Sequence, residues 1–411
     1  MRVGRPFIEK ASGTDDALGR VTIKVQNTSM KRRLELDAAR GLMLVWIALT
    51  HLPTVISTYS NQPFGFVSAS EGFIMLAALF SGRNYLKLAQ REGYPAMGKK
   101  AGTRGLRLYA YHVLLLCLAF GVLAPLAASG IRPGVHNMLD FYFAAPHRAL
   151  LDAALLIYRP PLLDILPMYI LFSVVLTPLA LKFGEKFGWK YVLGVSGGVW
   201  LAAQCGLKQA VYVGLSHVVA MRIPLRNMGA FDLWAWQFLW VGGLWLGARW
   251  VRNDLPIEKW ARKVVWPAVA IALGFCVMRY AVFPNVQPAM LGVLFDKWHL
   301  GVVRIIDFAA VAAVLIRFNS KLKWVAFRPL VMLGQASLQV FCVHLLFCFV
   351  GLTLMGTAEV VTGWTEGALM AATLAGMLVT AKIFEKSKPG GGGRPKPQVQ
   401  PLAIGNESAR S

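Results

Sequence analysis

The sequence has 411 residues, of which 56% are hydrophobic and only 15% are charged. A water-soluble domain of this size carries fewer apolar and more charged residues, so this composition excludes that class. The formal net charge of +23 would suit a nucleic-acid-binding protein, but the Lys and Arg residues gather in short segments between long apolar runs. We therefore predict a helical membrane protein whose cations set its orientation, with the lipid bilayer as a partner and no nucleic acid.

Apolar runs of about 20 residues recur along the chain, and each is long enough to cross a bilayer as a helix. Lys and Arg are frequent before the first run and in every second connection after it, and they are sparser in the other connections. By the positive-inside rule, this alternation predicts an all-α, polytopic membrane protein with both termini in the cytoplasm. The ten predicted transmembrane helices lie at about residues 39–58, 68–88, 107–128, 162–181, 190–207, 232–250, 264–283, 300–318, 329–354 and 366–384.

These helices form one predicted transmembrane domain at residues 31–385. Residues 1–30 contain no apolar run of the kind found in signal peptides, so we expect a polar cytoplasmic tail there. Residues 386–411 are rich in Gly, Pro and Lys, which predicts a flexible cytoplasmic tail. The five cysteines lie in apolar runs and form no Cys-x-x-Cys pair, so the sequence suggests neither a metal site nor a disulfide framework.

Two predicted outer connections, 129–161 and 208–231, are unusually long. Connections of this length in compact proteins are uncommon unless they are functional or disordered. Both combine aromatic side chains with His and Arg. Such residues can stack on and hydrogen-bond a sugar, but they also serve as anchors at the membrane interface, and both interpretations stay open.

Arg40 and His51 share one face of the first predicted helix. They are eleven positions apart, which is three helical turns plus about 20°, or roughly 16 Å along the axis. This spacing places a cation near one membrane surface and an imidazole near mid-membrane, where ionisable groups are expensive and often functional. The alternative is an interfacial Arg and a histidine that is hydrogen-bonded within a helix bundle.

Glu71 lies one turn into the second predicted helix, near its outer end. The connection between the first two helices is short, so they are expected to be antiparallel neighbours, and Glu71 could approach His51 from the outer side. A carboxylate beside an imidazole raises its basicity, as a general base requires. The alternative partner of Glu71 is a structural Arg or a backbone group.

Later spans carry further polar groups. His112 is placed near the cytoplasmic end of the third span, and Ser337 and His344, seven positions apart, share a face of the ninth. Each of these groups could instead bond a neighbouring helix. The sequence contains no P-loop, His-Glu-x-x-His or Gly-x-Ser-x-Gly motif, so it gives no support to nucleotide hydrolysis, zinc proteolysis or serine-hydrolase chemistry.

Arg40-x10-His51 is similar to the hallmark of the integral-membrane O-acyltransferases of the type-three superfamily, and Ser337 with His344 resembles their late Ser–His element. More closely, region 30–385 resembles the OpgC family, which succinylates osmoregulated periplasmic glucans. The matching segments are Arg33-x3-Asp37-x2-Arg40-Gly41, Glu71-x-Phe73, Leu108-Tyr109-x2-His112, Leu163-Asp164-Ile165-Leu166-Pro167-x-Tyr169, Ala235-Trp236-Gln237 and Leu333-Gly334-x2-Ser337-Leu338.

The resemblance implies that a succinyl group moves from succinyl-CoA, a cytoplasmic co-substrate, to a hydroxyl of a periplasmic glucan at the bacterial inner membrane. It implies no permanently bound cofactor and no metal ion. His51 would act as a general base or as a covalent acyl carrier. The expected site residues are His51 and Glu71 for catalysis, Asp37, Arg40 and His112 for the donor, Asp164, Tyr169, Trp236 and Gln237 for the acceptor, and Ser337 and His344 in support.

Two other functions stay open from the sequence. One is O-acetylation of another cell-envelope glycan. The other is transport of a sugar or acyl donor without chemistry, a class that often shows repeats and broken helices in matching halves. The chain shows no such repeat, although Leu52-Pro53 and Thr177-Pro178 are candidate breaks. The sequence does not indicate an oligomeric state.

Overall fold

The computed structural model describes residues 34–128, 132–219, 223–254, 257–284, 286, 288–318 and 327–387. The predicted tail 1–30 lies outside these residues, as does most of the predicted tail 386–411. Regular structure in the described part of the chain is helical, with two isolated β-bridges, which confirms the all-α class. Five helices are long and apolar enough to cross a bilayer: Ala69–Ala128, Ile165–Phe187, Lys259–Val282, Ser337–Leu354 and Trp364–Lys386. The count of ten spans and the cytoplasmic termini stay predictions.

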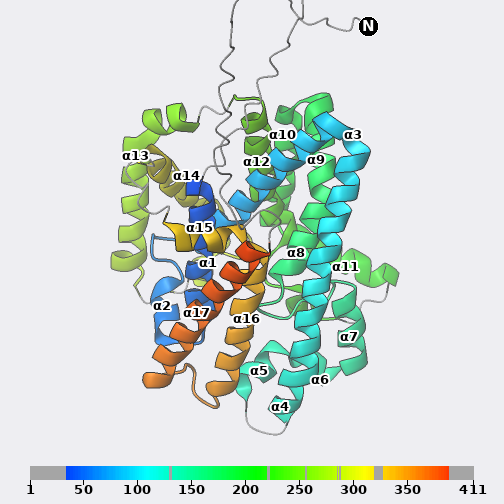
Figure 1. Ribbon diagram of the computed structural model, residues 1–411, viewed down its shortest axis with the longest axis vertical. Coiled ribbons are helices and arrows are strands. Elements are labelled where there is room, and N and C mark those ends of the chain that lie inside the picture. Colours follow the sequence, from blue (N-terminus) through cyan, green and yellow to red (C-terminus); the bar gives the residue numbers. More distant parts are fainter. Residues whose placement is uncertain are drawn as a thin grey trace, which may run out of the picture. The chain divides into compact units, whose positions relative to one another are not determined.

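The helices are arranged as a bundle of long and short segments (Figure 1). Labels with η mark π-helical or 3-10 turns. In chain order the elements are α1 Leu34–His51, α2 Val55–Ser60, α3 Ala69–Leu118, η1 Ala119–Leu123, α4 Ala124–Ala128, α5 Pro133–Met138, α6 Asp140–Ala144, α7 Pro146–Ala154, α8 Ile165–Leu171, η2 Phe172–Leu176, α9 Thr177–Phe187, α10 Trp189–Gln204, α11 Leu207–Val219, η3 Leu225–Met228, α12 Leu233–Val251, α13 Ile257–Val277, η4 Met278–Val282, η5 Pro288–Leu291, α14 Val302–Arg317, α15 Arg328–Gln335, α16 Ser337–Leu354 and α17 Trp364–Lys386.

Helix α3 differs from the prediction because it continues through the connection expected at residues 89–106. The chain bends at Gly93, whose φ of 87° and ψ of 168° are not helical. Glycine adopts such a positive φ without a steric penalty, and Pro95 removes a backbone donor two residues later. The two predicted spans are therefore the two arms of one bent helix, and the basic connection between them is helical (Figure 1).

Two predicted spans are instead broken. The first ends as α1 at His51 and resumes as α2 at Val55, because Pro53 cannot continue the helical hydrogen-bond ladder. The ninth is interrupted at Ala336, which separates α15 from α16. His51 is thus the last residue of its helix rather than lying two turns before its end.

The two long outer connections are not open loops. The first contains the short helices α5, α6 and α7, and the second contains most of α11 followed by η3. Their aromatic residues pack inward; for example, the rings of Phe120 and Tyr142 are stacked with centroids 4.6 Å apart. The first segment packs through α5 against α4 and α16, whereas none of the described side chains of α11 is buried, and this helix contacts α10.

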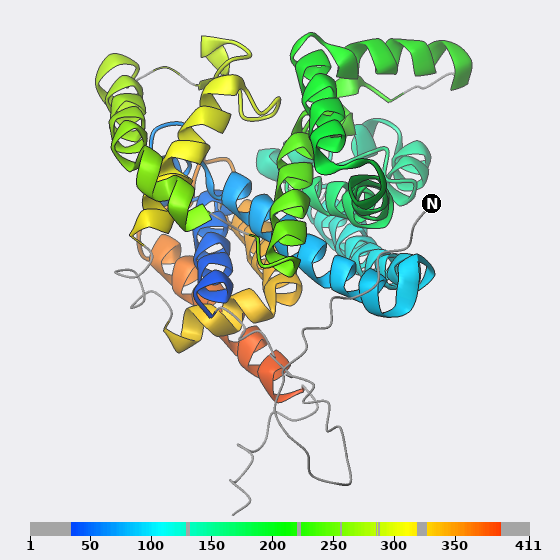
Figure 2. The ribbon, with the colours of Figure 1, turned by 90° about the horizontal axis from the view of Figure 1, so that it is seen from above.

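Glycines allow close backbone approach around α1, which contacts α3, α15, α16 and α17 (Figure 2). A Cβ atom added at Gly41 would clash with the carbonyl of Leu330, and one added at Gly334 would clash with the carbonyl of Asp37. Small residues at helix contacts are the usual means of bringing backbones together in membrane proteins. This contact fixes α15, and hence the start of α16, against α1.

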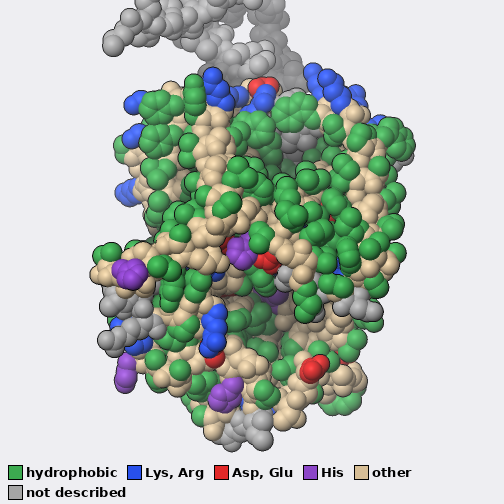
Figure 3. Space-filling model, turned by 180° about the vertical axis from the view of Figure 1, so that it is seen from behind, with side chains coloured by type: hydrophobic (Ala, Val, Ile, Leu, Met, Phe, Trp, Pro, Cys, Tyr) green, Lys and Arg blue, Asp and Glu red, His purple; other side chains and the backbone are tan. Residues whose placement is uncertain are grey.

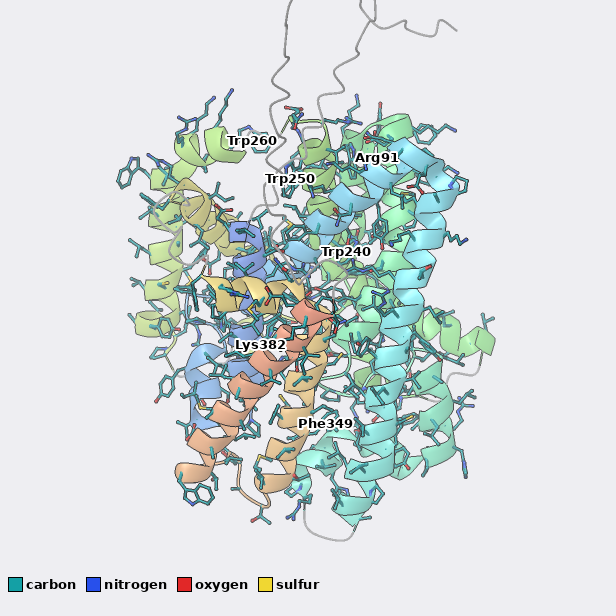
Figure 4. The ribbon with its side chains drawn as sticks, in the orientation of Figure 1. Arg91, Trp240, Trp250, Trp260, Phe349 and Lys382 are labelled. Carbon is teal, nitrogen blue, oxygen red and sulfur yellow. The ribbon has the colours of Figure 1, made fainter. Side chains whose placement is uncertain are left out.

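Tryptophans of α12 hold the other side of α3 (Figure 4). Trp240 is fully buried, and its Nε1 donates to Oγ1 of Thr177 over 3.0 Å. The Arg83 guanidinium lies over the ring of Trp250, 4.4 Å from its centroid. Helix α3 therefore contacts α1 on one side and α8, α9 and α12 on the other, and it positions both sets of helices.

Candidate active site

Two histidines meet where α1 ends. Nδ1 of His51 lies 3.3 Å from Nε2 of His344, and the rings are stacked with centroids 5.5 Å apart. One nitrogen of this contact must donate and the other accept, so each ring fixes the tautomer of the other. His344 is fully buried, whereas His51 keeps part of its surface accessible. Nε2 of His51 makes no hydrogen bond with the described residues.

Three expected site residues meet at the other end of α1. Arg40 donates to Oγ of Ser337, the first residue of α16, and its guanidinium lies 5.1 Å from the ring centroid of Phe80. One turn earlier, the buried Asp37 accepts from Nε2 of Gln335 over 3.5 Å. The break between α15 and α16 places Gln335 and Ser337 beside α1, so the cation is held by the same helix that carries His344.

Glu71 has the alternative partner foreseen for it, a structural Arg. Its Oε1 accepts from Nε of Arg304 over 3.0 Å and also from Nη2. Its Oε2 accepts from Oγ of Ser68 over 2.6 Å and from the Ser68 backbone N–H over 3.1 Å. Both charged side chains are completely buried. These contacts direct the carboxylate to α14 and to the start of α3, and they replace the approach to His51 that the sequence suggested.

Lys297 extends the site from the segment between η5 and α14. Its ammonium lies over the ring of Trp298, 5.1 Å from the centroid, and part of its side chain stays accessible. Burial lowers the pKa of Lys297 to about 8; Glu71 and Asp164 oppose this shift, and Arg304 adds to it. From behind, the surface is hollowed, and His, basic and acidic side chains lie around the hollow (Figure 3).

Comparison with models of protein families shows to which family this chain belongs. The model of one family, described as OpgC protein, matches residues 32–389, which is nearly the whole chain. The chain belongs to the OpgC family. The comparisons with curated proteins and with solved structures gave no match. Membership confirms the resemblance carried by the sequence motifs, and it supports a glucan-modifying acyltransferase as the general activity.

Trp236 and Gln237 of this OpgC chain are both buried. Trp236 is fully buried, so it has no exposed ring face for a sugar, and its Nε1 donates to the carbonyl of Trp298 over 3.1 Å. Gln237 accepts from Oγ of Ser196 over 2.7 Å and donates to its carbonyl over 2.8 Å. Both side chains hold neighbouring segments in place, and their predicted contact with the acceptor stays a prediction.

Asp164 and Tyr169 lie nearer the site. Oδ2 of Asp164 accepts from the backbone N–H of Ala230 over 3.1 Å, and the carboxylate interacts electrostatically with Lys297. Tyr169 is buried between aromatic rings, edge-on to Trp240 with centroids 5.3 Å apart, and interacts electrostatically with Arg40.

His112 lies further along its helix than predicted, and its donor-binding role stays a prediction. It is fully buried on α3, nineteen positions beyond the bend at Gly93, which is roughly 28 Å along a helix. Neither of its ring nitrogens has a hydrogen-bond partner among the described residues. The predicted start of the third span was too late because the basic connection is itself helical. This displaced His112 toward the donor end in the prediction.

The OpgC site includes two residues that sequence reasoning did not select. Arg304 begins a predicted span, where a cation is usually an interfacial anchor. Its signal was the presence of Asp307 three positions later, an unusual charge density for an apolar run. Lys297 is the one Lys or Arg among residues 284–299, and its position depends on how that segment folds over α12.

Proposed function

We propose that this chain is a multi-pass enzyme of the bacterial inner membrane that moves a succinyl group from cytoplasmic succinyl-CoA to hydroxyls of periplasmic glucans. The observation that carries the proposal is the contact between His51 and His344, with His51 partly accessible inside the bundle. Family membership supports the acyltransferase class. The donor, the acceptor and the role of His51 are our inference from this geometry and from the family motifs.

The histidine pair suits proton transfer. When Nδ1–H of His51 donates to Nε2 of His344, Nε2 of His51 is left as a free base. It takes the proton of the glucan hydroxyl as that oxygen attacks the thioester carbonyl carbon. The C–S bond then breaks, and the proton passes from His51 to the departing sulfur. The products are a glucan ester and the CoA thiol.

A covalent route is a second version of the same reaction. The His51 nitrogen attacks the thioester, the thiol departs with a proton, and the glucan hydroxyl then attacks the acyl-imidazole. Trapping of acyl-His51 in the absence of acceptor supports this version, and its absence in a single turnover supports direct transfer. In either version His344 orients the His51 ring.

The donor approaches from the end of α1 that carries Arg40. CoA is highly anionic, and the predicted inner connections are rich in Lys and Arg, which attract such a ligand. Arg40 is held by Ser337 and offers charge-assisted hydrogen bonds to an anionic part of the donor. The acceptor approaches from the end of the bundle at which Asp164 and Lys297 lie.

The decisive experiment compares His51→Ala with the parent protein by mass spectrometry of periplasmic glucans. We expect succinyl-sized mass additions to fall at least about 10²-fold, the usual scale for loss of a general base. The control is His217→Ala, because His217 is exposed on α11. Retained succinylation at equal protein abundance would remove His51 from this role. An acetyl-sized addition in the parent would identify the alternative donor, and transport without product would exclude the enzyme.

A further inference from the structure

Two aromatic rings connect Arg40 of α1 with a cation of α3. The Arg40 guanidinium lies 5.1 Å from the ring centroid of Phe80, and the Arg83 guanidinium lies 4.4 Å from the ring centroid of Trp250. The rings of Phe80 and Trp250 form a tilted pair with centroids 6.3 Å apart. Arg40 and Arg83 therefore border the same pair of rings, at the end of α1 from which the proposed donor approaches.

Helices α1 and α3 run in opposite directions. Arg40 contacts Phe80, whereas Met43, which comes later in α1, faces Gly72, which comes earlier in α3. A Cβ atom added at Gly72 would lie 3.1 Å from Sδ of Met43. His51 lies further along α1 in the same direction as Met43. Residues that follow Phe80 in α3 therefore lie beyond Arg40, on the side away from His51.

Three cations lie on one face of this later part of α3. Arg83, Lys87 and Arg91, which we call the cationic row, follow one another at intervals of four residues, or roughly 6 Å along the axis. Lys87 is partly accessible, and Arg91 is exposed just before the bend (Figure 4). Within the described residues neither of these two forms a salt bridge, whereas Arg252 is paired with Glu185 over 2.7 Å. Like charges four residues apart repel, so an anionic ligand would stabilise the row.

The spacing between His51 and Arg40 matches the length of the donor's arm. In an acyl-CoA, twelve atoms separate the thioester sulfur from the first phosphorus. The backbone of four residues has as many atoms and extends over about 14 Å. His51 and Arg40 are roughly 16 Å apart along α1. A thioester at His51 therefore places the first phosphate near Arg40, and the nucleotide half of the donor continues toward the cationic row.

We propose that the cationic row binds the phosphates of the nucleotide half of the acyl-CoA donor, while Arg40 lies at the phosphate nearest the arm. The inference rests on the proposed acyl transfer and names the residues that hold the donor outside the bundle. Arg and Lys form charge-assisted hydrogen bonds with phosphate oxygens. Because the cations are spaced along the helix, they can meet more than one phosphate of the same ligand. Anionic lipid headgroups share this chemistry, and the experiment separates the two sources.

The test compares two donors with purified, full-length protein and the glucan acceptor. Succinyl-4′-phosphopantetheine keeps the thioester, the arm and the first phosphate of succinyl-CoA, but it lacks the nucleotide half. In the double variant Lys87→Gln with Arg91→Gln, we expect the ratio of kcat/KM for succinyl-CoA to that for succinyl-4′-phosphopantetheine to fall about 10-fold or more, the scale of a hydrogen bond to a charged group. Lys87→Arg retains the charge and should keep most of the preference.

The matched control is Lys382→Gln, because Lys382 is exposed on α17, away from Arg91 (Figure 4). It should leave the donor ratio unchanged. The ratio does not depend on the amount of folded enzyme, so partial loss of protein cannot produce the expected result. An unchanged ratio in the double variant, or a parent protein without preference for succinyl-CoA, would overturn the inference.

Lipid binding gives a different result. Losses that are equal for both donors and that vary with phosphatidylglycerol added to the detergent would assign the cationic row to lipid headgroups, and would also overturn the inference. A parent protein that transfers no acyl group from either donor would overturn the proposed function itself.

Discussion

Glu71 and Arg304 form an ion pair with no accessible surface on either side chain. Charges in such a place are favourable only while each has its partner, because neither can regain water. Ser68 satisfies the second carboxylate oxygen and joins the start of α3 to α14 through the pair. The geometry therefore favours a structural role for Glu71 over the catalytic role suggested by its motif.

Glu71→Gln should lower the free energy of unfolding by about 3–5 kcal/mol, because it leaves the Arg304 charge buried without a counter-charge. Thermal unfolding in detergent measures this change. Glu71→Gln combined with Arg304→Met should recover much of the stability. If Glu71→Gln instead keeps full stability and abolishes glucan acylation, Glu71 belongs to the catalytic groups after all.

For single residues, the sequence predicted the members of the candidate site better than it predicted the contacts between them. The motifs selected Arg40, His51, Ser337 and His344, and the structure joins them in two pairs, Arg40 with Ser337 and His51 with His344. Their contacts join positions 293 and 297 residues apart, so no local pattern could pair them. The buried partner of Glu71 was missed because an Arg at the start of an apolar run usually serves as an interfacial anchor.

Among the elements, α15 is the short helix on which the site geometry depends. Gly334 contacts the backbone of α1 so closely that any side chain would collide with the Asp37 carbonyl and approach the Gly41 backbone. Backbone atoms cannot move aside as a flexible side chain can. Displacement of α15 would carry Gln335 and Ser337 away from α1.

Gly334→Ala should therefore destabilise the protein by about 1–3 kcal/mol or more, the usual cost of overpacking, and reduce acylation together with stability. Unfolding measurements and the glucan assay check both effects. Gly98→Ala is the control, because an added Cβ there meets nothing within 4 Å and alanine is the better helix former. Equal stability of the two variants would contradict the packing argument.

Element boundaries followed from the sequence only where a strong local signal existed. Pro53 was a candidate break and does end α1. The break at Ala336 carries no Gly or Pro, and it depends on the packing of α15 against α1. The helical connection around Gly93 was missed because its Lys and Arg residues suggested a loop, although both are good helix formers.

For the molecule as a whole, periodic charge predicted ten crossings, while length and hydropathy single out five helices. The two numbers differ partly because some predicted spans are broken and partly because some short helices contain polar groups. Helix α1 ends at His51 and contains Glu35, Asp37 and Arg40, and α14 has only 16 residues, with Arg304 and Asp307 among them. Such helices rely on their neighbours rather than on their own hydrophobicity to lie in a membrane.

Cysteine labelling in intact cells tests the predicted orientation. In a background lacking the five native cysteines, Asn61→Cys should react with a membrane-impermeant maleimide once the outer membrane is permeabilised. Gly98→Cys should react only after the inner membrane is opened. Both positions are exposed, so accessibility to the reagent is matched. The opposite labelling pattern would invert the topology and place the donor and acceptor on the wrong sides.

Helix α16 holds α1 at two levels, through Ser337 near one end and through His344 two turns further along. The order of these contacts means that the two helices run in the same direction. A slide of α16 along α1 would therefore release the guanidinium and the imidazole in a single movement. The two contacts are therefore coupled. A ligand that displaces α16 at one of them also changes the other.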